Sequence, residues 1–175
     1  MKNILKAFRK SIKHRKYQAV INRVCENDTA TTLQNYYSIV KITDRMFSTM
    51  DSQTIRRILR NVDNLDLSTA IKGFSGRSKH NIFNNLPTQI AALVAEDTEY
   101  MKNLTSKTIV DSVKKIFLVI ARLINAEIIT SADDPAVKDL ANMIHEAHND
   151  ISLVDNAKMR EIMDEYLKKA QDSAE

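Results

Sequence analysis

Few side chains in this sequence could hold a metal ion or act as a nucleophile. His145 and His148 stand three residues apart, a spacing that lets both face one metal ion on a helix, and Glu146 and Asp150 lie close by. Two histidines without a third converging ligand are a weak signal, so we predict no metal site. Cys25 is the only cysteine, and no catalytic motif surrounds it.

The sequence also lacks the motifs of common enzyme classes. It has no glycine-rich phosphate loop, no nucleophile elbow and no paired cysteines at zinc-site spacing. We therefore predict a non-enzymatic protein that needs no cofactor. The single cysteine favours a reducing compartment, and the N-terminus lacks the apolar stretch of a signal peptide. We expect a cytoplasmic protein, with the inner face of the membrane as an open alternative.

Positive charge is concentrated at the N-terminal end. Residues 1–25 contain eight Lys or Arg and no acidic residue, whereas the whole chain has a formal net charge of +4. The segment predicts a basic patch that could dock on a protein or on an anionic membrane surface, with nucleic acid the weaker reading. It could equally be a surface helix whose apolar side covers the core. The patch comprises Lys6, Arg9, Lys10, Lys13, Arg15 and Lys16.

The elements that must position these side chains are helices. Two glycines, two prolines and 43% hydrophobic residues leave little material for the tight turns of a sheet protein. Apolar residues recur at helical spacing, most clearly from Ile109 to Ile124. We predict an all-α, compact bundle of about eight short helices, armadillo-like on its N-terminal side.

Local signals predict where several helices begin and end. One helix is expected to follow Asn27 and Asp28, to run through Leu33 and Met46 and to stop near Asp51, whose carboxylate is expected to cap the next helix. Gly73 is expected to end a helix with a positive φ, which glycine adopts at low cost. Pro87 suits the first turn of a helix that runs to Tyr100.

The C-terminal part predicts two further helices. Asp134 is expected to cap the first of them, ahead of Pro135. Their apolar faces should pack on the protein itself or on a second copy of it. These faces are formed by Val137, Leu140 and Ile144, and by Met159, Ile162, Met163, Tyr166 and Leu167.

Between residues 50 and 129 the sequence resembles the C-terminal domain of FliG, the switch and torque protein of the bacterial flagellar motor. No single element is specific, but five follow one another in the family's order. They are Ile55–Asp63, the Ala-Ile-Lys-Gly of residues 70–73, the Phe-Asn-Asn-Leu of residues 83–86, the acidic pair Glu96-Asp97, and Val113–Ile129.

The resemblance implies a set of charged residues that face the stator of the motor. The family's Lys falls on Lys72 and its acidic pair on Glu96 and Asp97. One expected Arg is Gln89 here, and the other falls on Thr105, with Lys107 two residues away. The partner-binding residues implied by this correspondence are Lys72, Gln89, Glu96, Asp97 and Lys107.

The helix that carries these charges should place its apolar side inward. We expect Ile90, Leu93 and Val94 to be buried, and the acidic pair to be exposed on a surface that Lys72 or Lys107 also reaches.

These observations predict three parts: N-terminal helices at 1–49, a FliG C-terminal-like bundle at 50–129, and two extra helices at 130–175. The function that the resemblance implies is a non-enzymatic interaction module of a flagellar motor, active in motility and chemotaxis. Its partners would be stator or switch-complex proteins, and a homo-oligomer stays open. The alternatives are a diverged cytoplasmic adaptor outside the motor, or a peripheral membrane or nucleic-acid binder that uses the basic N-terminal helix.

Overall fold

Helix α8 (Ser106–Asn125) forms the centre of the fold in the computed structural model, which describes residues 15–26, 30–132, 134, 136–146 and 157–172. Its buried face holds Val113, Ile116, Phe117 and Ile120, each at most 1% exposed. This face packs against α3 (Ser38–Thr49), α5 (Asn64–Ala70) and α9 (Ala136–Glu146). The described residues contain helices and no strand, so the prediction of an all-α bundle is confirmed.

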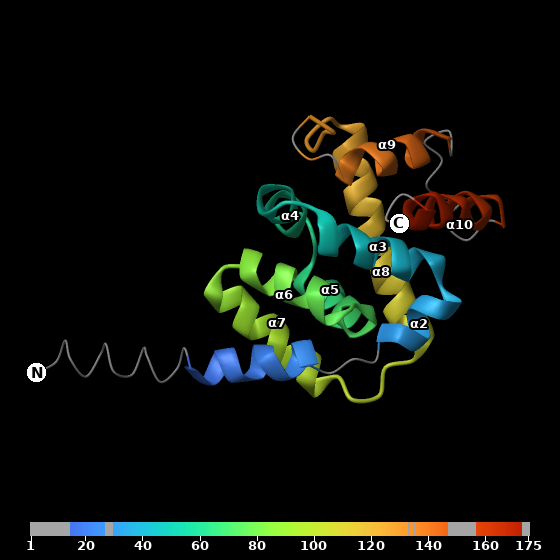
Figure 1. The fold of residues 1–175 in the computed structure, drawn as a ribbon. Helices are drawn as coiled ribbons and strands as arrows, with labels where there is room; N and C mark the ends of the chain where they lie inside the picture. Colours follow the sequence, from blue (N-terminus) through green and yellow to red (C-terminus); the bar gives the residue numbers. More distant parts are fainter. Residues whose placement is uncertain (1–14, 27–29, 133, 135, 147–156, 173–175) are drawn as a thin grey trace, which may run out of the picture.

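The remaining helices surround this centre (Figure 1). A helix over residues 15–26 comes first, followed by α2 (Ala30–Tyr36). Helix α4 (Ser52–Leu59) packs on α6 (Gly76–Asn85), and α7 (Thr88–Tyr100) packs on α5. A short 3₁₀ helix, η1 (Ile71–Gly73), continues α5, and α10 (Ala157–Asp172) lies on α3 and α9.

Capping side chains set the helix boundaries. The Asp51 carboxylate accepts hydrogen bonds from the backbone N–H groups of Gln53 and Thr54, which confirms the cap predicted there. Asp63 does the same at the start of α5. At α9 the carboxylate of Asp134 accepts from the N–H of Ala136, also as predicted.

The single helix expected to run through Leu33 and Met46 and to stop near Asp51 is two helices. Tyr37 is extended, with φ −131° and ψ 102°, and it separates α2 from α3. The break lets α2 pack against η1 while α3 packs against α6 and α8. One straight helix could not reach both surfaces.

The positive φ predicted at Gly73 is wrong. No described glycine has a positive φ, and Gly73 ends η1 in a right-handed conformation. A Cβ atom at this position would lie 3.1 Å from Cγ2 of Ile109 and 3.3 Å from Cγ1 of Val40. Glycine therefore serves close packing between η1 and its neighbours at this point, not a left-handed turn.

The left-handed residue lies at the end of α8 instead. Glu127 has φ 56°. The N–H groups of Glu127 and Ile128 donate to the carbonyls of Ile124 and Leu123, both at 2.9 Å. This is the Schellman pattern of a helix end, in which the residue after the cap takes the left-handed conformation.

Candidate functional site

Helix α7 presents one face to the core and one to solvent. Pro87 precedes it and accepts the N–H of Ala91 at 2.9 Å, as expected for the start of a helix. The buried residues Ala91, Ala92, Val94, Ala95 and Thr98 form one side. The opposite side, which we call the outward face of α7, consists of Gln89, Leu93, Glu96, Asp97 and Tyr100 at spacings of three or four residues.

The outward face is partly apolar. Leu93 is 45% exposed and Tyr100 is 82% exposed, so the prediction that Leu93 is buried is wrong. The cause is register: Val94, one residue later, takes the core position and is fully buried. Glu96 and Asp97 are half-buried, and Gln89 is exposed. The outward face therefore combines two large apolar side chains with two carboxylates.

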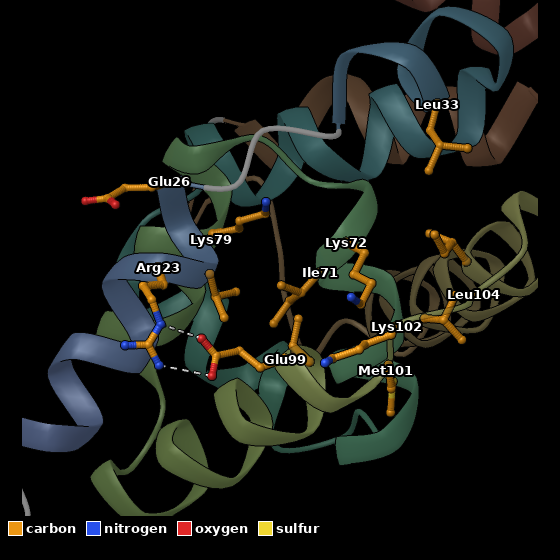
Figure 2. A pocket seen from close by; sticks show the side chains of 13 residues that line it. Arg23, Glu26, Leu33, Ile71, Lys72, Lys79, Glu99, Met101, Lys102 and Leu104 are labelled. Atoms are coloured by element: carbon orange, nitrogen blue, oxygen red, sulfur yellow. Dashed lines mark hydrogen bonds and ion pairs between the residues drawn. The ribbon is translucent and has the colours of Figure 1, made fainter.

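A cleft of about 870 Å³ lies beside the C-terminal end of α7. Helix 15–26, α2, η1, α6, α7 and the start of α8 all contribute to it (Figure 2). Its charged side chains are Arg23, Glu26, Lys72, Lys79, Glu99 and Lys102, and its remaining lining is Val24, Leu33, Ile71, Thr98, Met101, Leu104 and Ile109.

An ion pair joins the two sides of this cleft. The Arg23 guanidinium donates from Nε to Oε1 of Glu99 at 2.8 Å and from Nη2 to Oε2 at 3.1 Å. This bidentate contact lowers the pKa of Glu99, through the hydrogen bond first and the charge of Arg23 second. The two side chains are 58% and 36% exposed, so solvent and salt screen the pair.

The two lysines that the sequence singled out lie apart from each other. Lys72 is half-buried in the cleft, and burial lowers its pKa. Lys107 is exposed in the first turn of α8, where its ammonium lies 3.2 Å from Oδ2 of Asp111. The acids that line the cleft with Lys72 are Glu26 and Glu99, which differ from the acidic pair that the sequence singled out.

The basic patch is described only in part. Arg15 and Lys16 are exposed on helix 15–26, and Lys6, Arg9, Lys10 and Lys13 lie outside the described residues. On the same helix Val20, Val24 and Cys25 are at most 6% exposed and belong to the core. The apolar side of residues 15–26 thus covers the protein, as a surface helix does.

The described part of the chain contains neither a metal-binding cluster nor a helix able to span a membrane. No group of three or more His, Cys, Asp or Glu side chains is arranged there to hold a metal ion. His145 is exposed, and His148 lies outside the described residues. No helix in this part has the length and apolar character needed to cross a bilayer.

Sequence reasoning did not single out Arg23, Lys79, Glu99 or Lys102. Arg23 counted only toward the charge of the N-terminal end, and Glu99 follows the acidic pair that the resemblance singled out. Their common feature is a cleft whose walls lie far apart in the sequence. Arg23 and Glu99, for example, are 76 residues apart. No local pattern signals such a contact.

Comparison with protein families matches residues 39–130 to the FliG C-terminal domain. This match covers more than half of the chain. The chain belongs to the FliG C-terminal domain family. It therefore contains a domain of the flagellar motor switch type, which the resemblance between residues 50 and 129 predicted.

Curated relatives agree with this assignment. The flagellar motor switch protein FliG of Thermotoga maritima is 38% identical over 74 residues, which is 42% of this chain and 22% of the relative. FliG of Borreliella burgdorferi is 30% identical over 74 residues, with the same shares. FliG of Bacillus subtilis is 29% identical over 75 residues, 43% of this chain and 22% of the relative. No solved structure matches the chain significantly.

These relatives set the scope of the assignment. The aligned region spans less than a quarter of each relative, so it concerns one domain of a longer protein. All three are named as motor switch proteins and none as an enzyme, in agreement with the prediction of a non-enzymatic protein. The N-terminal helix 15–26 and the helices α9 and α10 lie outside the matched residues.

Proposed function

We propose that this chain is an interaction domain of a flagellar motor, at the cytoplasmic side of the membrane, which contacts another motor component through the outward face of α7. One observation carries the proposal. Leu93 and Tyr100 are exposed on the same face as Glu96 and Asp97, in the region that matches the FliG C-terminal domain. Single exposed apolar residues are ordinary, but here two flank an acidic pair on one helix face.

The chemistry of this face suits a contact that forms and breaks quickly. Each exposed ion pair is worth only ~0.2–1 kcal/mol, so two carboxylates steer a partner more than they hold it. Leu93 and Tyr100 add apolar area, at ~25 cal/mol per Å² buried. The partner expected from this composition presents basic side chains around an apolar one. We propose a stator protein, or another protein of the switch complex, as this partner.

The experiment reverses one charge at a time. Glu96→Lys and Asp97→Lys should each reduce swimming in soft agar and reduce capture of motor proteins by the purified domain. Glu161→Lys is the matched control, because Glu161 is an exposed acid on α10, outside the matched residues. Leu93→Ala should weaken capture even at high salt, where the ~3 Å Debye length at 1 M suppresses the charge contribution.

The opposite result has a definite meaning. If both reversals fold normally and leave motility and motor-protein capture as in the Glu161→Lys control, the outward face of α7 is not a motor contact. The adaptor function then takes its place. Gln89 and Thr105 favour that outcome to some degree, because both replace an arginine that the resemblance implies.

A further inference from the structure

The cleft beside α7 has the size of a small-molecule site. Its volume of about 870 Å³ falls within the range of roughly 300–1,000 Å³ that is typical of ligand pockets. Its walls come from helix 15–26 on one side, from η1 and α6 on another, and from the segment that joins α7 to α8. Residues 15–26 lie outside the family match, so one wall of the cleft is built by residues that the matched domain does not include.

The charge of the lining is predominantly positive. Four basic and two acidic residues line the cleft, a formal excess of two positive charges. One of the two acids, Glu99, accepts hydrogen bonds from Nε and Nη2 of the Arg23 guanidinium. The other charged side chains of the lining are three lysines and Glu26. Lys79 is 1% exposed, so the ammonium groups that can meet a ligand are those of Lys72 and Lys102, and two ammonium groups at one cleft favour an anion between them.

Burial strengthens this preference. Lys72 is half-buried in the wall of the cleft. Burial penalises the charged form of Lys72 and lowers its pKa. An anion near its ammonium would offset that penalty, and it would do so more strongly than in bulk water because the surroundings are less polar. Figure 2 shows the ammonium ends of Lys72 and Lys102 directed toward the same space.

Four apolar side chains of the lining, which we call the apolar floor, come from four parts of the chain. Leu33 comes from α2, Ile71 from η1, Leu104 from the segment before α8, and Ile109 from α8. Such a surface gains nothing from a bare inorganic ion. It can hold the ring or the hydrocarbon part of a larger molecule, since apolar area removed from water stabilises a complex.

We propose that this cleft binds a small phosphorylated molecule, with its phosphate between Lys72 and Lys102 and its apolar or ring portion on the floor. Lysine ammonium groups bind phosphate as point charges and require no fixed geometry. The Arg23–Glu99 pair acts as a positioning element. It keeps the Glu99 carboxylate turned toward helix 15–26 and thereby limits the repulsion between Glu99 and a bound phosphate.

The test uses the full chain and two metal-free probes, pyrophosphate and ADP, in isothermal titration calorimetry at low salt. Both should bind saturably with one site per chain. ADP should bind at least tenfold more tightly than pyrophosphate, because its ring and sugar reach the floor. Citrate, an anion of similar charge without phosphate, should bind at least tenfold more weakly than pyrophosphate.

Matched variants locate the site. Lys102→Gln concerns an exposed side chain and should weaken ADP binding at least fivefold, and Lys72→Gln should do the same. Arg23→Gln should also weaken binding, because it releases the Glu99 carboxylate toward the cleft. Lys107→Gln is the control: Lys107 is an exposed lysine outside the cleft lining, and its removal should change the dissociation constant less than twofold. Far-UV circular dichroism checks that each variant is folded.

Three results would overturn the proposal. They are the absence of saturable binding by either probe, an equal loss of affinity in Lys107→Gln and Lys102→Gln, and citrate binding as tight as that of pyrophosphate. ADP binding no tighter than pyrophosphate binding would overturn the role of the apolar floor. The titrations need no motor protein, so their outcome is independent of the motility experiments on the outward face of α7.

Discussion

The two segments that flank the matched domain are attached to it in different ways. Helix 15–26 contributes three buried side chains to the core and is tied to α7 by the exposed Arg23–Glu99 pair. Helices α9 and α10 contribute more, with Val137 and Leu140 fully buried and Ile144, Met163 and Leu167 at most 7% exposed. Figure 1 shows the first segment beside α7 and the second around the far end of α8.

The N-terminal segment is therefore attached through fewer buried side chains than the C-terminal one. The prediction that the apolar faces of the last two helices pack on the protein itself is confirmed for their described residues. A part-buried hydrogen bond reinforces that attachment, because Oδ2 of Asp134, a residue only 3% exposed, accepts from the N–H of Asp51 at 2.8 Å. The N-terminal helix contributes fewer buried side chains, and it borders the cleft. Conditions that change salt or pH should therefore act at the N-terminal side first.

The largest effect is expected in α9. Leu140→Ala should lower the free energy of unfolding by about 2–5 kcal/mol, because it leaves a cavity at a fully buried position. Urea denaturation measures this change. Leu93→Ala is the same substitution at a 45% exposed position and should cost less than about 1 kcal/mol. If both substitutions lowered the free energy of unfolding equally, α9 would not be part of the core. The C-terminal segment would then be no more firmly attached than the N-terminal one.

A smaller effect of opposite sign is expected where the chain leaves α8 for α9. Glu127→Gly should raise the free energy of unfolding by about 0.5–1 kcal/mol, because glycine relieves the left-handed strain and loses part of that gain to its more flexible unfolded state. Thermal unfolding in a calorimeter measures it. Ala126→Gly is the control, since φ is −86° there and glycine should not stabilise it. Destabilisation by Glu127→Gly would show that the left-handed turn is not under strain.

The smallest effect on global stability, and the most local, is expected at Glu99. Its pKa lies below the ordinary 4.5, so the contribution of the Arg23–Glu99 pair is fully present above that pH and is lost as the pH falls through the lowered pKa. Glu99→Gln should raise hydrogen exchange in residues 15–26 at neutral pH and should remove the pH dependence. High salt should act in the same direction.

The matched control for this last prediction is Glu96→Gln, on the same helix. It should leave exchange in residues 15–26 unchanged, because Glu96 does not line the cleft that Arg23 borders. If Glu99→Gln and the parent chain exchange alike in residues 15–26 from neutral to acidic pH, the ion pair does not hold the N-terminal helix. The comparison between the flanking segments would then rest on apolar contacts alone.

Much of the fold followed from local patterns, and most of the cleft did not. The Asp51 and Asp134 caps and the register of α8 depend on residues close in sequence, and each was predicted correctly. The position of Gly73 after Lys72 predicts a turn, although close packing against Val40 and Ile109 explains the glycine. A glycine that serves a turn and one that serves close packing look alike in a sequence.

The sequence by itself determined the all-α class, the family of the central domain and the apolar faces of the last two helices. Helical periodicity and capping act over three or four residues, so they can be recognised in the sequence without knowledge of the tertiary structure. Only the tertiary structure decided that the chain breaks at Tyr37, that Leu93 faces solvent, and that Arg23 meets Glu99 beside Lys72 and Lys102. Those outcomes depend on which surfaces remain after the other helices have packed. The packing of the helices against one another involves residues from the whole chain, so no local sequence pattern predicts it.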